Sequence, residues 1–370
     1  MIKGLYIHIP FCKTICTYCD FAKLVGSASL QEEYMVALEK ELLFHREQLD
    51  SLQTIYIGGG TPSSISISLM RAFLTMLKQV VDLPSLEEFT IEANPQDVTQ
   101  EWIELIKEFH VTRVSVGVQS FNDSLLISIG RTHTSKQALE AIELLKKENT
   151  FSLSIDLIYS LPNETLQNLK SDLDTALSLE MDHLSIYSLI LEEKTLLYHQ
   201  VHQLGLEMPS EEEEERMALW IQSRIHLSPY VHYEISNYGL VGHFSKHNLL
   251  YWNMDDYLGI GLGAASMIEN IRTTNQKTIR KYIESVNKNS NGIDTSEPVD
   301  EIQETILLGL RKAEGISKSD FLKKFGQTPF ERYPGLIQHL DHGLLRESDD
   351  RVHLTEKGFL LSNQVFIELF

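Results

Sequence analysis

Short β-rich runs alternate with amphipathic helical segments through the first two-thirds of the chain. In segments such as 30–49, 135–148 and 164–180, apolar residues recur at helical spacing. The strand candidates between them are 5–9, 54–58, 89–93, 113–118, 153–158 and 184–189. Repeated strand–helix units predict parallel strands joined by right-handed crossovers. Six units are too few for a complete eight-fold barrel, so an open partial barrel and a doubly wound sheet both fit the pattern.

The alternation ends near Tyr238, and this change suggests three regions. Residues 1–237 form the predicted α/β domain, and 238–298 form a connecting region whose stretch 245–267 is expected to be loop-rich, aromatic and glycine-rich. From Val299 the pattern is helices, a hairpin at 346–358 and a last helix, which resembles a winged-helix unit. We interpret residues 299–370 as an α+β packing cap on the larger domain.

Composition and charge narrow the functional classes. The formal net charge of −20 argues against sequence-independent nucleic acid binding, which relies on clustered Lys and Arg. No segment has the roughly 18 apolar residues of a membrane span, and the first eleven residues do not resemble a signal peptide. Three cysteines, an odd number, indicate a reducing compartment, so we expect a cytoplasmic protein. The acidic run 210–216 is interpreted as a helix start.

Polar residues stand at the ends of successive predicted strands. GGGTP (58–62) follows the second strand, Glu92 and Asn94 end the third, Gln119 ends the fourth and Asp156 lies late in the fifth. Parallel-strand folds build sites at the carboxyl ends of their strands. We therefore expect these residues to converge on one mouth.

All three cysteines of the chain, Cys12, Cys16 and Cys19, lie in one short stretch. A closed zinc site usually has four protein ligands, and His8 is an awkward fourth because it lies on a predicted strand. A tight turn with three thiolates can instead hold a 4Fe-4S cube. One iron then has no protein ligand and can bind a substrate or cofactor through nitrogen and oxygen.

This CxxxCxxC spacing resembles the signature of the radical S-adenosylmethionine (SAM) superfamily, and GGGTP resembles its glycine-rich strand. The resemblance implies a partial (β/α)6 TIM-like barrel in which SAM chelates the open iron. It also implies that an electron from the cluster can cleave the sulfur–carbon bond of SAM, which yields methionine and a 5′-deoxyadenosyl radical. Glycine suits a close backbone approach to SAM because it lacks a Cβ.

A narrower resemblance covers nearly the whole chain. YIHIPFCKTICTYCDF, GGGTPS, EANP, GVQSFND, GRTH and IDLIYSLP occur in this order. They resemble oxygen-independent coproporphyrinogen III oxidase and its relatives, which include haem chaperones. The SAM-site residues implied by this match are Tyr6, Tyr18, Gly59, Gly60, Thr61, Glu92, Gln119, Arg131 and Asp156.

Several features favour the haem chaperones of this family over the oxidases. The oxidases carry a further cysteine at the position of Phe21 and a longer segment ahead of the cluster loop. The chain also matches the HNxxYW motif associated with haem binding in the chaperones. One stretch differs from the chaperones: EEKTLLY (192–198) stands where they usually have EPGTPL. Imidazole is a common haem-iron ligand, and aromatic rings supply an apolar surface for porphyrin. The motif residues are His247, Asn248, Tyr251 and Trp252.

The first functional hypothesis is a haem chaperone that carries haem as cargo. Its implied partners are haem, a haem-accepting apoprotein such as a respiratory haem enzyme, an electron donor for the cluster and a second copy of the chain in a homodimer. The alternative is radical oxidative decarboxylation of coproporphyrinogen III. A third hypothesis is a radical SAM enzyme that acts on another substrate.

Overall fold

The computed structural model describes residues 1–370 and is built around one curved sheet of 12 strands. Its centre consists of six parallel strands in sequence order, which confirms the six predicted strands to within one residue at every end. These strands are β1 (Gly4–Ile9), β2 (Thr54–Gly59), β3 (Glu88–Ala93), β4 (Arg113–Gln119), β5 (Ser152–Tyr159) and β6 (His183–Ser188). A doubly wound sheet would reverse its strand order at a switch point. The sequential order therefore supports the partial barrel, which stays open.

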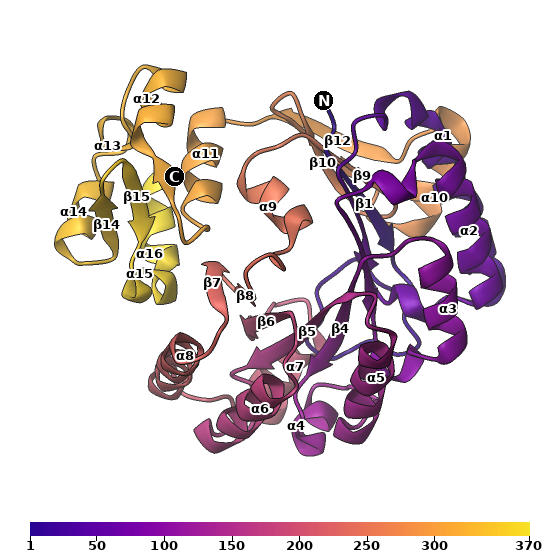
Figure 1. Cartoon of the computed structure of the whole chain (residues 1–370), viewed down its shortest axis with the longest axis horizontal. Helices are drawn as coiled ribbons and strands as arrows, with labels where there is room; N and C mark the ends of the chain where they lie inside the picture. The colour runs from indigo at the N-terminus through magenta and orange to yellow at the C-terminus, as the bar shows by residue number, and fades with distance from the viewer.

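The helices that connect these strands cover the outer face of the sheet (Figure 1). Between the six strands lie α1 (Ala28–Phe44), α2 (Ile67–Val80), α3 (Gln100–Glu108), α4 (Asp123–Ser128), α5 (Ser135–Glu148) and α6 (Leu166–Ser178), whereas α7 (Leu196–Leu204) and α8 (Glu211–His226) follow β6. Short 3-10 turns lie at Arg46–Gln48, Pro62–Ser64, Leu83–Ser85, Pro95–Asp97 and Ile367–Leu369. The acidic run begins α8 as expected, since Ser210 and Glu213 form a reciprocal capping box. None of the helices is long and apolar enough to cross a membrane.

Strand β4 illustrates how the sequence assigns the two faces of the sheet. Val114, Val116 and Val118 are completely buried in the main hydrophobic core. The alternating residues Arg113 and Gln119, with Ser115 and Gly117 between them, line a cavity on the inner face. Side chains of a strand alternate between faces, so one strand supplies both core and site.

The prediction that 245–267 is loop-rich is wrong. This stretch contains α9 (Lys246–Trp252), β9 (Tyr257–Ile260) and β10 (Ala265–Ile268). β9 adds to the sheet parallel to β1, and β10 follows antiparallel to it. The remaining sheet strands are β11 (Ile271–Asn275), β12 (Ile293–Pro298), β8 (Asn237–Gly239) and β7 (Val231–Glu234), and α10 (Ile279–Asn289) packs on α1. The local pattern failed because the partner of β9 lies about 250 residues earlier in the chain.

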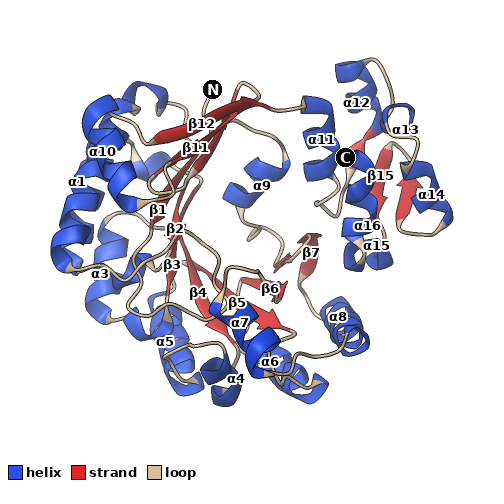
Figure 2. Cartoon of the chain, turned by 180° about the vertical axis from the view of Figure 1, so that it is seen from behind, coloured by secondary structure: helices blue, strands red, loops and turns tan.

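The C-terminal residues form a separate unit with its own core (Figure 2). Its three-stranded sheet includes the predicted hairpin, and its core contains Ile306, Phe321 and Val352. Its elements are α11 (Glu301–Gly309), β13 (Ile316–Ser317), α12 (Lys318–Phe325), α13 (Pro329–Arg332), α14 (Leu336–Asp341), β14 (Leu345–Ser348), β15 (Arg351–Leu354), α15 (Glu356–Leu360) and α16 (Ser362–Phe366). The proposed boundaries at 237/238 and 298/299 stay predictions.

Candidate functional site

A cavity of about 440 Å³ occupies the inner face of the sheet, where the strand ends converge. Residues from five of the central strands and from the cysteine loop line it together. The predicted site residues in this lining are Cys12, Cys16, Cys19, Tyr18, Gly59, Gly60, Thr61, Glu92, Gln119, Arg131, Asp156 and Asn248. Residues far apart in the sequence are thus brought to one place.

The cysteine loop is held at both ends and in the middle by backbone hydrogen bonds. Phe11 and Leu24 form a β-bridge where the loop leaves and rejoins the sheet edge. Between them, the Thr17 N–H donates to the Ile129 carbonyl at 3.0 Å, and the Thr17 carbonyl accepts from the Leu197 N–H at 2.9 Å. These bonds fix the loop over the cavity without using any cysteine side chain.

The three thiols of the cysteine loop all line the cavity. No group of three His, Cys, Asp or Glu side chains is close enough to share one metal ion. In a 4Fe-4S cube each thiolate binds a different iron, so its thiolates need not converge on one point. Burial raises the pKa of Cys12 and of Cys19. Cluster binding therefore has to release the protons that these thiols hold.

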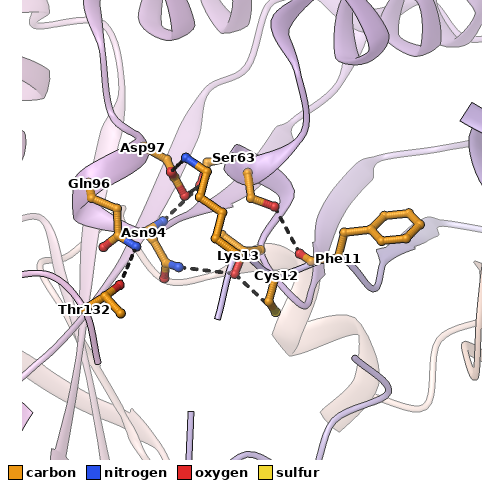
Figure 3. Close-up of polar contacts among 10 residues, drawn as sticks. Phe11, Cys12, Lys13, Ser63, Asn94, Gln96, Asp97 and Thr132 are labelled. Carbon is orange, nitrogen blue, oxygen red and sulfur yellow. Dashed lines mark hydrogen bonds and ion pairs between the residues drawn. The ribbon is translucent and has the colours of Figure 1, made fainter. Parts of the chain in front are cut away.

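A polar network ties the cluster loop to the ends of β2 and β3 (Figure 3). Lys13, next to Cys12, pairs with the Asp97 carboxylate at 2.5 Å, and Ser63 donates to the same carboxylate at 3.2 Å. The Asp97 side chain is only 1% exposed, whereas that of Lys13 is 60% exposed. The Asn94 backbone N–H donates to Ser63 at 3.0 Å, which links this network to the end of β3.

We expect Lys13→Met to make the cluster loop less firmly held, because the buried Asp97 carboxylate loses its cationic partner. Retention of iron under a chelator challenge should fall about tenfold, the size typical of lost outer-shell support at metal sites. The visible absorbance of the reconstituted protein would measure iron release over time. The matched control is Lys107→Met, which removes an ion pair with Glu148 at 2.5 Å on the outer face. Equal iron release in both variants would contradict this role.

Two glycines give the cavity wall a close approach that no other residue allows. Gly59 has a φ of +117°, and a Cβ there would lie 2.6 Å from the His8 ring. A Cβ on Gly60 would lie 2.6 Å from the Pro10 backbone and 3.0 Å from the Cys12 Sγ. Their bare backbone beside a cysteine sulfur fits a SAM-ligated cluster, in which the cofactor meets exposed peptide groups.

Two half-buried carboxyl groups, those of Glu92 and Asp156, stand on the inner face of β3 and β5, the two strands that flank β4. Glu92 accepts from the Tyr56 hydroxyl at 2.7 Å and from the Gly59 N–H at 3.1 Å. Burial raises the pKa of Glu92 to about 7, and these two hydrogen bonds oppose the shift. Burial also raises the pKa of Asp156, which accepts from Ser115 at 3.0 Å. Both carboxyl groups can accept hydrogen bonds from hydroxyl or amino groups of a bound ligand.

Arg131 brings a positive charge to the cluster side of the cavity. Its Nη2 donates to the Asn94 side-chain oxygen at 2.7 Å and to the Gly117 carbonyl at 2.6 Å, and its Nη1 lies 3.5 Å from the Cys16 Sγ. Its buried Nε has no partner.

Gln119 has a φ of +68° at a register shift between β4 and β5. Backbone strain of this kind often marks functional sites.

The remaining predicted residues lie outside this lining. The Tyr6 hydroxyl forms a hydrogen bond with His8 Nδ1 at 2.9 Å. His247 is completely buried, with Nδ1 2.6 Å from the Thr54 hydroxyl and Nε2 2.7 Å from the Tyr251 hydroxyl. Trp252 lines a second cleft, of about 310 Å³, beside the C-terminal unit. Only Asn248 of the HNxxYW motif faces the cluster cavity.

Several cavity residues are not among those predicted from the sequence. They include Arg113 and Ser115 of β4, Tyr56 of β2, and Ser185 and Tyr187 of β6. The signal was available, because residues two positions apart share one strand face. Gln119 was recognised at the end of β4, and stepping back by twos along the strand reaches Ser115 and Arg113.

Comparison with known proteins agrees with this geometry. Residues 6–176 match the Radical SAM superfamily, and residues 297–361 match the HemN C-terminal domain. The structure of coproporphyrinogen III oxidase (HemN) from Escherichia coli superposes with a TM-score of 0.86 over 100% of this chain and 90% of its own. At 20% identity this similarity concerns the fold. The chain is a radical SAM protein, and its fold agrees with that class.

The sequence relatives are more specific. Heme chaperone HemW of Lactococcus lactis is 40% identical over 98% of this chain and 96% of its own. Heme chaperone HemW of Bacillus subtilis is also 40% identical, over 99% of this chain and 98% of its own. The chain therefore belongs to the HemW family. Its superfamily implies a 4Fe-4S cluster and SAM as cofactors, and these relatives are named as chaperones rather than as oxidases.

Proposed function

We propose that this protein is a haem chaperone, which holds a SAM-ligated 4Fe-4S cluster, binds haem and transfers it to an acceptor protein. The observation that carries the proposal is the position of α9. This helix bears the HNxxYW motif and contributes Asn248 to the cavity lined by the three cysteines. One residue of the motif associated with haem thus lines the same cavity as the loop suited to a cluster.

The chain's own residues suit both the cluster and SAM. Cys12, Cys16 and Cys19 would hold the cluster, and Gly59 and Gly60 leave room for SAM beside it. When bound, the cluster supplies one electron and an open coordination position. Arg131 would hold the SAM carboxylate, and Glu92 and Asp156 would accept hydrogen bonds from its amino or hydroxyl groups.

His247 is the proposed haem-iron ligand. Burial lowers its pKa to about 3, so the imidazole is neutral near pH 7 and no proton competes with iron for its lone pair. Its Nε2 contacts Tyr251, so ligation would exchange the Tyr251 hydroxyl for iron. Because His247 is completely buried, α9 would have to move outward for haem to enter. A single helix of seven residues is a small enough element for such a movement.

Exposed apolar side chains at the mouth of the cavity also fit a flat, apolar cargo. Phe21 and Ile190 are each 71% exposed, and Ile15 is 44% exposed. All three line the same cavity as the cysteines. Exposed apolar groups clustered at one site are typical of binding surfaces.

Anaerobic titration of the reconstituted protein with haem, with and without SAM, tests the proposal. Wild type should develop a Soret band, and His247→Ala should lose most of it. His45→Ala is the matched control, since His45 is also buried but lies at the end of α1. Without a Soret band in wild type the proposal is wrong. Formation of protoporphyrinogen from coproporphyrinogen III, with SAM and a reductant present, would favour the oxidase instead.

A further inference from the structure

Arg113 is a buried cation that the cluster and SAM do not explain. It is only 4% exposed and begins β4, whereas Gln119 ends the same strand. It shares the inner face of β4 with Ser115 and lines the cavity. Because six residues of an extended strand separate it from Gln119, it lies roughly 20 Å along β4 from that end. It therefore belongs to the inner end of the cavity.

The guanidinium of Arg113 has almost no partner within the protein. Nη1 donates to the His243 carbonyl at a long 3.4 Å, and no carboxylate pairs with the group. Asp156 interacts with it only through space, since its Oδ1 accepts from Ser115. Glu88, at the start of β3, instead accepts from the backbone N–H groups of Lys246 and His247, at 2.9 and 3.0 Å. A buried charge without a partner is costly, so an external anion would stabilise it.

The groups around the inner end of the cavity leave this charge unbalanced. His183 is buried and neutral, because burial and the nearby Arg113 charge lower its pKa well below 6.5. Its two ring nitrogens are bonded to Ser154 and Tyr233 at 2.8 Å each. Ser185 and Asn248 line the same cavity with uncharged polar side chains. These uncharged side chains can orient a ligand, and Arg113 supplies the positive charge beside them.

We propose that Arg113, together with Asn248, forms a carboxylate subsite that receives a propionate of the tetrapyrrole cargo. The inference rests on the proposed haem-chaperone function and deepens it, by assigning a second contact for the cargo beside the α9 motif. A guanidinium and a carboxylate form two parallel charge-assisted hydrogen bonds, and both nitrogen donors and the negative charge would be desolvated together. The same chemistry would also fit the carboxylate of SAM, so a test has to separate these two sources.

The test compares haem with haem dimethyl ester, in which both propionates lack charge. Dissociation constants for both ligands would be measured by Soret titration in wild type and Arg113→Gln. We expect Arg113→Gln to weaken haem binding about tenfold or more, with little change for the ester. SAM binding, measured by equilibrium dialysis, should be unchanged. The matched control is Arg71→Gln, which alters an exposed ion pair with Glu108 on the outer helices.

Each other outcome overturns the assignment in a distinguishable way. Equal weakening of both ligands would mean that Arg113 only supports the fold, and unchanged haem affinity would exclude a propionate contact. Weakened SAM binding with unchanged haem binding would give the subsite to SAM. No Soret band in wild type would defeat the haem-chaperone function itself, and this inference with it. If Arg113→Gln does not fold, Arg113→Lys replaces it, and a smaller loss of affinity confined to haem is then expected.

Discussion

Replacing Cys16 with alanine is expected to abolish the 4Fe-4S cluster. The chain has three cysteines in all, so no other thiol can take the vacant position. Two thiolates would leave two irons of the cube without protein ligands. Iron and acid-labile sulfide per chain after anaerobic reconstitution should fall about tenfold or more, together with the visible absorbance of the cluster.

The control for this experiment is Thr61→Val. The Thr61 hydroxyl lies 3.5 Å from the Cys12 Sγ, and Thr61 lines the same cavity. Thr61 has no thiol and is not one of the proposed cluster ligands. We expect this variant to keep most of its iron. A full iron content in Cys16→Ala would show that the loop does not ligate a cluster through these three thiols.

Glu41→Ala is expected to cause the largest loss of stability. The Glu41 carboxyl group is buried in α1 and accepts four hydrogen bonds from the segment that follows β9. The donors are the Gly261 N–H at 2.8 Å, the Asn275 Nδ2 at 2.9 Å, the Tyr282 hydroxyl at 2.6 Å and the Gly292 N–H at 2.8 Å. Alanine would leave the two backbone N–H groups and the Tyr282 hydroxyl unpaired, whereas Asn275 Nδ2 would keep its bond to the Gly261 carbonyl at 2.9 Å. We therefore expect a loss of roughly 4 kcal/mol in the free energy of unfolding.

Urea unfolding followed by circular dichroism would measure this loss. Glu32→Ala is the matched control, because Glu32 lies on the exposed side of the same helix. It should change the free energy of unfolding by less than about 0.5 kcal/mol. If Glu41→Ala is as stable as this control, the four hydrogen bonds contribute little and the attachment of 261–292 to α1 depends on apolar packing alone.

The sequence by itself determined the six parallel strands and the position of the cysteine loop. Both depend on local information: apolar residues at every second position define a strand face, and three cysteines within eight residues define a set of thiolates. The order of strands and helices then predicts one site at the carboxyl ends of the strands. Glu92, Gln119 and Asp156 were expected in this site, and they line the cavity there. The HNxxYW motif was likewise recognised from adjacent residues.

Only the tertiary structure decided how distant segments complete the site. Glu41 lies in an ordinary amphipathic helix, and nothing local shows that residues 261–292 will surround it. The β-pairing of β9 with β1 and the burial of His247 against Thr54 also join segments about 190 to 250 residues apart. In the sequence, Arg113 is an ordinary first residue of a strand. Only the positions of the neighbouring carboxylates in the structure show that none of them forms an ion pair with it. Such contacts depend on the free energy of the whole fold, which local spacing and propensity do not contain.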